Sequence, residues 1–590
     1  MGSTIKLYAK DTTNQSYDLK SKTPKNSLSS GTVDYLIITN DAFESFLEPL
    51  AEWKTQKGLV TKIKTINEIH LQYPGRSTPK KIKDCIIDFY NNKNTQWVLL
   101  AGDDIHVPSQ YAYCPEDFPW DGDFVSCDTY YTDLDNNWDL NGDDLWGTNL
   151  DEFDYEAEVY VGRLTANNEI EMQNLVQQIL NYEKNPPIGS WMSHALFAGS
   201  ILQFDQDWNN DSIVDYGECD GNRFHNFLKN LLPDNWTSIF LAQTQGIKGS
   251  DNHSDLQLDY NNLRNAINEG SSIGSIFAHG APQVMAIDKW TIDYDGDMLF
   301  DYTADPFYGD GDSIDTAKQS SLIDTSYAML EPVDNKLGLF YLGSCSTGTF
   351  DDPNDCLAEY FLKNAAIGVI AGSNVVWGED QWYERDHGGW FIEGLGFRFW
   401  EQLFQYNQPG KALALAKADY AIDRNNTSEI VGFPAWDDNM LKKWEDKALK
   451  QYNLLGDPEV PIWFSIPKQL NLSVIQPSNN NGNTITLMVT AEGEAVQGAT
   501  ITYTTNNDLL WKGTTLGNGT IDVPQSIIDL KGTVLTVSKI GYLPYQESIL
   551  QGGLEAVPGY DISITFSICV SFIIIYIIYF TRFKRLKNET

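Results

Sequence analysis

From residue 33 onward, short apolar runs alternate with longer stretches of helical periodicity. Residues 33–39 (VDYLIIT) have the length of a buried strand, residues 42–57 carry apolar side chains at helical spacing, and residues 59–66 return to a strand pattern. A helix over 78–91 and a strand over 97–102 (WVLLAG) continue the series. Strands and helices that alternate in this way form βαβ units around a parallel sheet.

The same alternation resumes after the Pro186-Pro187 break and continues to about residue 466. Before the break the pattern predicts a strand over 157–164 and a helix over 168–183. After it the pattern predicts strands over 194–199, 236–242, 271–278 and 366–371, and helices over 258–268, 356–363, 389–404, 411–422 and 439–452. The sequence therefore predicts two α/β regions, one over residues 31–187 and one over 188–466.

The ends of the chain have different patterns. Residues 1–30 are polar and rich in Lys, Ser, Thr and Asn. Residues 467–552 consist of short alternating runs separated by Gly and Asn turns, which is typical of a small β-sandwich. We expect this sandwich to act as a spacer or presentation module, because it holds no cluster of titratable residues.

Residues 562–580 (ISITFSICVSFIIIYIIYF) form an uncharged run long enough to cross a membrane, and the basic residues of 581–590 follow directly. The positive-inside rule places that tail in the cytoplasm and everything before it outside. The sequence thus predicts a single-pass protein anchored at the cell surface by a C-terminal transmembrane helix. A buried core helix is the alternative.

The 590 residues are too many for one hydrophobic core and indicate two to four domains. The chain has 41 Lys and Arg against 81 Asp and Glu, a formal charge of −40, which argues against nucleic acid as a partner. Seven cysteines in this length do not make a disulfide framework, although Cys114 and Cys127 could pair in an oxidising compartment.

Acidic residues gather in loops whose spacing favours Ca²⁺. Oxygen ligands at every second position around a Gly resemble the first half of a calcium loop, without the Glu of a full EF-hand. The candidate ligands are Asp133, Asp135, Asn137, Asp139, Asn141 and Asp143 in one loop and Asp293, Asp295, Asp297 and Asp301 in another. A solvated acidic surface without an ion is the alternative.

Two apolar runs of strand length end in residues that suit nucleophilic catalysis. LGLFYLGSC ends in Cys345, and SSIGSIFAHG ends in His279 and Gly280. Catalytic groups of parallel sheets gather at the carboxyl ends of the strands, so these residues are candidates for a nucleophile and its base. Taken alone, each has a common structural explanation, namely a buried inert thiol and a hydrogen-bonded core histidine.

A cysteine nucleophile needs a base and two N–H donors that stabilise the tetrahedral oxyanion. We expect His279 to supply the base and the amides of Gly280 and Cys345 to form the oxyanion hole. His387-Gly388 is a weaker candidate, because it follows Cys345 in polar sequence rather than ending a strand. Cys356 and Cys219 also lack a strand-end context.

Over roughly residues 30–465 the chain resembles the gingipain-type cysteine peptidases, which share the caspase-like fold. The segments that carry the resemblance are DYLIITNDAFESFLEPLAEWKTQKGLVTKI, WVLLAGD, DTYYTDLDNNWDLNGDDLWG, EVYVGRLTA, FAHG, YLGSC and YNLLGDPEVPIW. It implies two side-by-side α/β subdomains, an immunoglobulin-like C-terminal domain, structural calcium, and a cysteine endopeptidase that acts on protein or peptide substrates.

The resemblance also implies roles for individual residues. Cys345 and His279 would be the catalytic dyad, with Glu218, or next to it Asp220, as the acid that orients the histidine. Relatives select Arg or Lys through an acidic pocket, which Trp377, Glu379 and Asp380 would line here. Two alternatives stay open: a transpeptidase or sorting enzyme of the same fold, and a catalytically silent adhesion protein that binds calcium.

Overall fold

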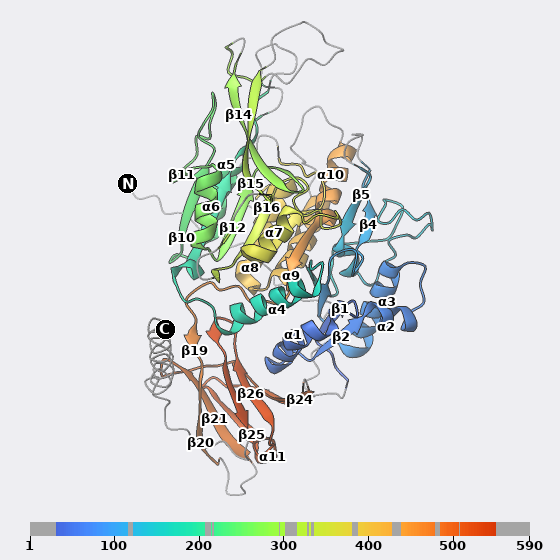
Figure 1. Ribbon diagram of the computed structural model, residues 1–590, viewed down its shortest axis with the longest axis vertical. Coiled ribbons are helices and arrows are strands. Elements are labelled where there is room, and N and C mark those ends of the chain that lie inside the picture. The colour runs from blue at the N-terminus through green and yellow to red at the C-terminus, as the bar shows by residue number, and fades with distance from the viewer. Residues whose placement is uncertain are drawn as a thin grey trace, which may run out of the picture.

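A computed structural model describes residues 31–115, 122–206, 214, 217–293, 296–300, 315–326, 330–331, 335–379, 388–426, 438–477, 484–506 and 508–549. Within these ranges the chain forms one large sheet flanked by helices, a separate β-sandwich, and several small sheets and hairpins (Figure 1).

Eleven strands of the described residues make up the large sheet, which is mostly parallel. In spatial order they are β11 (Leu256–Gln257), β10 (Thr237–Ala242), β7 (His194–Gly199), β12 (Ile273–Phe277), β16 (Gly338–Gly343), β17 (Ala366–Gly372), β18 (Tyr452–Gly456), β6 (Tyr160–Leu164), β3 (Trp97–Ala101), β1 (Tyr35–Thr39) and β2 (Thr61–Thr65). The strands of the two α/β regions thus lie side by side in one sheet.

Helices pack against both faces of this sheet. They are α1 (Glu44–Gln56), α2 (Ile66–Gln72), α3 (Thr78–Lys93), α4 (Glu169–Lys184), α5 (Gly221–Leu228), α6 (Tyr260–Glu269), α7 (Leu357–Asn364), α8 (Phe391–Tyr406), α9 (Pro409–Asn426) and α10 (Asp438–Gln451).

Strand β1 shows how the sheet separates two cores. Tyr35 and Ile37 belong to the core that contains side chains of α1 and α4, whereas Leu36 and Ile38 belong to the core that contains side chains of α3. Successive side chains of a strand point to opposite faces, so a strand covered by helices on both sides must be apolar throughout. This explains the uninterrupted apolar run at residues 35–38.

Strand β18 joins the two halves of the sheet. It pairs antiparallel with β17, where Leu454 lies opposite Ile370, and its other edge meets β6 through Leu455 and Arg163. The sequence pattern did not predict this strand: the predicted helix over 439–452 ends at its first residue, and no element is predicted over residues 453–456. β18 therefore brings the end of the α/β region between the two halves.

Smaller strands border the sheet. They are the hairpin β4 (Gln110–Tyr113) and β5 (Phe124–Cys127), the pair β8 (Ile201–Gln203) and β9 (Cys219–Asp220), and a three-stranded sheet of β13 (His279–Ala281), β14 (Val284–Ile292) and β15 (Thr316–Asp324). Cys114 and Cys127 are buried free thiols in the β4–β5 region.

The C-terminal domain is a sandwich of two antiparallel sheets around its own core. One sheet contains β20 (Asn471–Pro477), β21 (Thr484–Ala491), β22 (Glu494–Ala495) and β25 (Thr520–Pro524); the other contains β24 (Asp508–Thr514), β23 (Thr500–Thr505), β26 (Thr533–Ser538) and β28 (Tyr545–Ile549). The linker strand β19 (Lys468–Gln469) pairs with β27 (Tyr542–Leu543), and α11 spans Gln525–Ile528.

The sandwich docks on the C-terminal end of α1 (Figure 1). The Thr502 hydroxyl donates to the carbonyl of Gln56, and Lys512 Nζ donates to the carbonyl of Gly58 at 2.8 Å. The last carbonyls of a helix have no partner within the helix, and a cation is favourable there. The C-terminal domain thus binds the last helical carbonyl of α1 and the carbonyl of Gly58 just beyond the helix.

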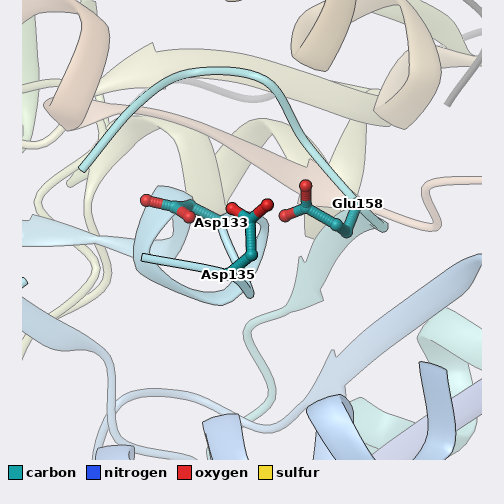
Figure 2. A group of neighbouring side chains, drawn as sticks. All are labelled: Asp133, Asp135 and Glu158. Atoms are coloured by element: carbon teal, nitrogen blue, oxygen red, sulfur yellow. The ribbon is translucent and has the colours of Figure 1, made fainter. Parts of the chain in front are cut away.

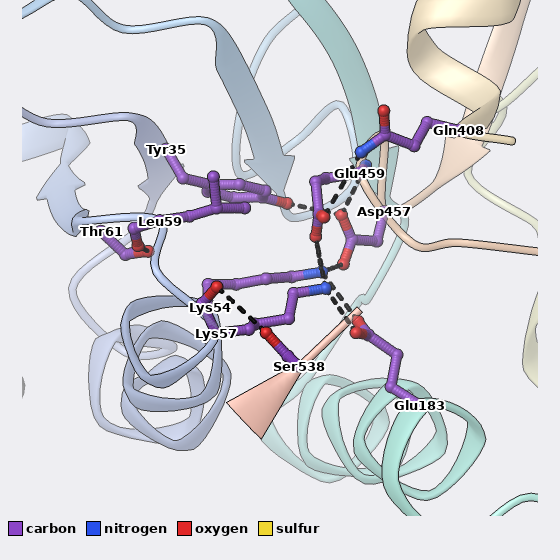
Figure 3. Close-up of polar contacts among 10 residues, drawn as sticks. All are labelled: Tyr35, Lys54, Lys57, Leu59, Thr61, Glu183, Gln408, Asp457, Glu459 and Ser538. Atoms are coloured by element: carbon purple, nitrogen blue, oxygen red, sulfur yellow. Dashed lines mark hydrogen bonds and ion pairs between the residues drawn. The ribbon is translucent and has the colours of Figure 1, made fainter. Parts of the chain in front are cut away.

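A buried cluster of charges centred on Lys54 ties α1 to α4 and to the segment after β18 (Figure 3). Lys54 Nζ lies 2.9 Å from Glu183 Oε1, 2.5 Å from Asp457 Oδ2 and 2.8 Å from Glu459 Oε2, and its side chain is fully buried. The Tyr35 hydroxyl donates to Asp457 at 2.7 Å. Burial lowers the pKa of Lys54, but the carboxylates outweigh it and hold that pKa well above its ordinary value.

The predicted architecture needs one correction. No helix in the described ranges is both long and apolar enough to span a bilayer. This finding contradicts the predicted transmembrane helix, and with it the predicted single-pass surface protein that contacts the membrane. Residues 562–580, on which that prediction rested, lie outside the described residues.

Candidate active site

His279 and Cys345 follow two neighbouring strands. β12 and β16 pair in parallel, with Phe277 opposite Gly343. His279 comes two residues after Phe277, and Cys345 comes two residues after Gly343. The two side chains therefore emerge at the same carboxyl edge of the sheet, which is where open α/β sheets form their sites.

Both residues line one cleft of about 200 Å³. The loop after β17, residues 375–378, forms one wall, and Ile392 at the start of α8 adds to it. Cys219 lines the same cleft. A thiol and an imidazole thus share a concave space large enough for a peptide side chain.

Cys345 stands in a tight turn directly after β16. Its half-buried Sγ donates to the Val376 carbonyl at 3.4 Å. Ser346 adopts the left-handed conformation with φ of 54°, and its amide donates to the Asn374 carbonyl at 2.9 Å. Non-glycine residues in this conformation are uncommon and concentrate at functional sites, where the surroundings enforce them.

Gly280 lies against the main chain of the Cys345 turn. A Cβ at position 280 would come 2.5 Å from the Cys345 carbonyl oxygen and 2.9 Å from Ser344 Cβ. Glycine is thus required for the two strand ends to approach this closely.

The N-terminus of α7 holds both strand ends. The Leu357 amide donates to the Pro282 carbonyl at 2.6 Å, and the Ala358 amide donates to the Thr347 carbonyl at 2.9 Å. These carbonyls belong to the turn after Gly280 and to the turn after Cys345. A helix N-terminus carries partial positive charge, so this end of α7 favours negative charge at the edge where Cys345 lies.

The acid that contacts His279 is Asp288, on β14. His279 Nε2 lies 3.6 Å from Asp288 Oδ2, and the two side chains are 33% and 27% exposed, respectively. Burial lowers the pKa of His279, and Asp288 opposes that shift. Sequence reasoning missed Asp288, because it did not predict the hairpin after Gly280. The signal was the strand-like alternation of VMAIDKWTI directly behind HGAPQ.

Glu218 and Asp220, the acids expected to orient the histidine, have other partners. Glu218 pairs with Arg223 and with Lys248, each at 3.3 Å, and burial raises the pKa of Glu218. Asp220 caps α5 and accepts hydrogen bonds from Ser250 and Asn252. Basic and polar neighbours in the chain around α5 thus satisfy both acids, and neither contacts His279.

Of the expected pocket residues, Trp377 lines the cleft. Glu379 is fully buried and its Oε2 accepts from the Trp390 amide at 2.8 Å, while Asp380 lies outside the described residues. The carboxylate next to the cleft wall is Glu393 on α8: a Cβ at Gly378 would lie 3.0 Å from its Oε1.

The weaker candidates are also accounted for. The Cys219 thiol donates to Glu393 at 3.4 Å. Cys356 is fully buried at the start of α7, and burial raises its pKa well above the ordinary value, so it is a poor nucleophile. His387 lies outside the described residues.

The first acidic loop brings three carboxylates together: Asp133, Asp135 and Glu158 (Figure 2). Their nearest oxygens all lie within 4.8 Å of one another. Asp133 and Glu158 are buried, and burial raises the pKa of Asp133. Two ligands of one Ca²⁺ at about 2.3–2.6 Å each can be at most roughly 5 Å apart, so the spacing fits this ion.

The other predicted calcium ligands do not join this cluster. Asp139 pairs with Arg76, and Asn141 and Asp143 bond to each other. The Asn137 carboxamide accepts from the Asp139 amide at 3.2 Å. In the later loop, Asp293 and Asp297 bond to nearby backbone amides, and Asp295 and Asp301 lie outside the described residues.

Comparison with known proteins gives a family match over most of the chain. The model of peptidase family C25 matches residues 28–463. Gingipain R2 of Porphyromonas gingivalis is 20% identical over 514 residues, which cover 86% of this chain and 55% of that protein. Lys-gingipain HG66 of the same organism is 21% identical over 547 residues, 88% of this chain and 26% of that protein. The chain spans about half, or less, of the length of these relatives.

Solved structures show the same fold. The crystal structure of the Arg specific cysteine proteinase gingipain R matches with a TM-score of 0.56 and 15% identity, over 89% of this chain and 99% of that one. A complex of Porphyromonas gingivalis RgpB pro- and mature domains matches with a TM-score of 0.56 and 16% identity, over 87% of this chain and 99% of that one.

Proposed function

Because the chain belongs to peptidase family C25, we propose that it is a cysteine endopeptidase that hydrolyses protein or peptide substrates. The observation that carries this proposal is the position of Cys345 and His279 after neighbouring parallel strands in one cleft. Family membership supplies the reaction class, and the site supplies a candidate nucleophile and a candidate base that line the same cleft.

The proposed reaction proceeds through an acyl-enzyme. Cys345 transfers its proton to His279 and attacks the scissile carbonyl, and the amides of Gly280 and Cys345 stabilise the oxyanion. His279 then protonates the leaving amine, and water hydrolyses the thioester. The lowered pKa of His279 supports this role, because the neutral imidazole is the form that accepts a proton.

Hydrolysis of a denatured protein and of a peptide library tests the proposal. We expect Cys345→Ala to abolish cleavage and labelling by a thiol-reactive peptide, and Cys219→Ala, in the same cleft, to retain both. Absence of cleavage and labelling in the folded wild type would instead favour the silent adhesion protein. Products joined to an added amine would favour the transpeptidase.

We also propose Ca²⁺ as a structural ion bound by Asp133, Asp135 and Glu158. The three carboxylates come from two segments about 23 residues apart, and the loop between them packs around Trp138. Bringing like charges this close costs energy unless a cation neutralises them. Lys83 on α3 supplies one positive charge to these three acids; burial lowers its pKa to about 8, so it is mostly protonated at neutral pH and still leaves the cluster with net negative charge.

For the substrate, we propose a basic residue before the cleaved bond. Two relatives bear names that specify Arg or Lys. Glu393 supports the same preference, because it lies directly behind the cleft wall at Gly378; burial raises its pKa to about 8 in the free protein, and a bound guanidinium or ammonium group would favour its ionised form. Peptides with Arg, Lys or Ala at this position test the proposal: equal cleavage of all three, or an unchanged preference in Glu393→Gln, would contradict it.

A further inference from the structure

We propose that Asp288 is the positioning residue for His279, so that the site works as a Cys345–His279–Asp288 arrangement. The inference rests on the proposed peptidase function. It assigns the acid to a strand that follows the histidine in the chain, not to the α5 region that precedes it.

The hairpin register places Asp288 on the same face as the histidine. In the pairing of β13 with β14, His279 lies opposite Ala286, and Asp288 comes two residues further along β14. Residues two apart on a strand share a face, and the diagonal neighbour across a strand pair is within reach of a long side chain. The 3.6 Å contact between His279 Nε2 and Asp288 Oδ2 follows from this register.

The main chain of Asp288 is fixed from two directions. In the long antiparallel pairing of β14 with β15, Asp288 lies opposite Gln319. On the other side, Gln243 Nε2 donates to the Asp288 carbonyl at 2.7 Å, and Gln243 Oε1 accepts from the Ile201 amide at 3.2 Å. Gln243 is fully buried at the end of β10, so it attaches Asp288 to the edge of the large sheet.

The charges around His279 leave Asp288 as its partner. Lys289, the next residue on β14, directs its ammonium to Gln245. Glu218 is neutralised by Arg223 and Lys248. At 3.6 Å the contact is electrostatic rather than a hydrogen bond, so Asp288 favours the imidazolium that forms when His279 takes the proton of Cys345.

Kinetics of three variants test the inference. We expect Asp288→Asn to lower kcat roughly 10- to 100-fold with little change in KM, because the imidazolium loses its counter-charge. The acidic limb of the kcat/KM profile should move to lower pH. Asp288→Glu should restore part of kcat, and Glu218→Gln is the matched control, which should leave the pH limb unchanged.

A readout without catalysis separates this inference from the proposed function. In the Cys345→Ala background, NMR titration of the histidines should show the His279 pKa falling when Asp288→Asn is added. Melting curves show whether each variant is folded. An unchanged His279 titration, or an Asp288→Asn variant with wild-type kcat and pH limb, would overturn the role of Asp288. A shifted titration in a chain without peptidase activity would refute only the proposed function.

Discussion

Gly280 packs so closely on the Cys345 turn that a Cβ at position 280 would lie 2.5 Å from the Cys345 carbonyl oxygen. A backbone carbonyl cannot move aside as the end of a flexible side chain can, so Gly280→Ala must push the two strand ends apart. We predict that it lowers hydrolysis at least about tenfold, because oxyanion donors act only when correctly placed. Peptide hydrolysis and a melting curve of the same sample measure the effect.

Gly517→Ala is the control for this substitution. A Cβ at Gly517 meets no atom within 4 Å, and the residue lies in the C-terminal domain. It should leave hydrolysis unchanged. If Gly280→Ala retains wild-type rates while folded, the amide at position 280 has no part in the reaction.

Lys54→Met should destabilise the protein by about 3–5 kcal/mol, because it leaves buried carboxylates without their cation. The Lys54 side chain is fully buried, as is that of Asp457, and Glu183 is nearly so. Lys64→Ala is the control: its pair with Glu68 spans 3.3 Å, with Glu68 43% exposed, so its removal should cost less than about 1 kcal/mol. Urea denaturation measures both, and equal losses would contradict the prediction.

Local pattern located most elements of the sheet and its helices. The helix predicted over 168–183 is α4 at Glu169–Lys184, where the Asn168 side chain accepts from the Glu171 amide. Capping and periodicity are properties of neighbouring residues, so one sequence suffices to detect them. The strand predicted over 194–199 is β7 without change.

Features that depend on long-range pairing could not be found in this way. β18 forms a strand because it pairs with β17 on one side and with β6 on the other, and both partners are far from it in the sequence. Asp288 meets His279 only through the hairpin, and Glu158 joins Asp133 from a separate segment. The spacing of acids along the loop predicted Asp139 as a calcium ligand, but its carboxylate forms an ion pair with Arg76 instead.

Calcium should raise the melting temperature of the wild type relative to a sample in EGTA, because an ion that binds only the folded state stabilises it. At a free concentration of about 100 times Kd this stabilisation is about 2.7 kcal/mol. Glu158→Gln removes one of the three carboxylates and should abolish most of the difference. Asp143→Asn, an exposed acid of the same loop that bonds to Asn141, should keep it. If the wild type melts at the same temperature in calcium and in EGTA, the proposed structural Ca²⁺ site is wrong.

Glu393 should make the protein less stable as the pH rises. Burial raises the pKa of this carboxyl to about 8 from the ordinary 4.5, and the Glu379 carboxylate adds to the shift. The folded state keeps a proton that the unfolded state releases, so this contribution to stability is complete below about pH 4.5 and is lost as the pH rises toward 8.

Glu393→Gln removes that titration. Relative to the wild type, the variant should therefore gain stability between pH 5 and pH 8.5: its free energy of unfolding should rise by at most roughly 5 kcal/mol compared with that of the wild type. Urea denaturation at the two pH values measures the change. Glu494→Gln, at an exposed position in the C-terminal domain, should follow the wild type at both. If Glu393→Gln also follows the wild type, the carboxyl is ionised in the folded protein and the cleft wall carries a permanent negative charge.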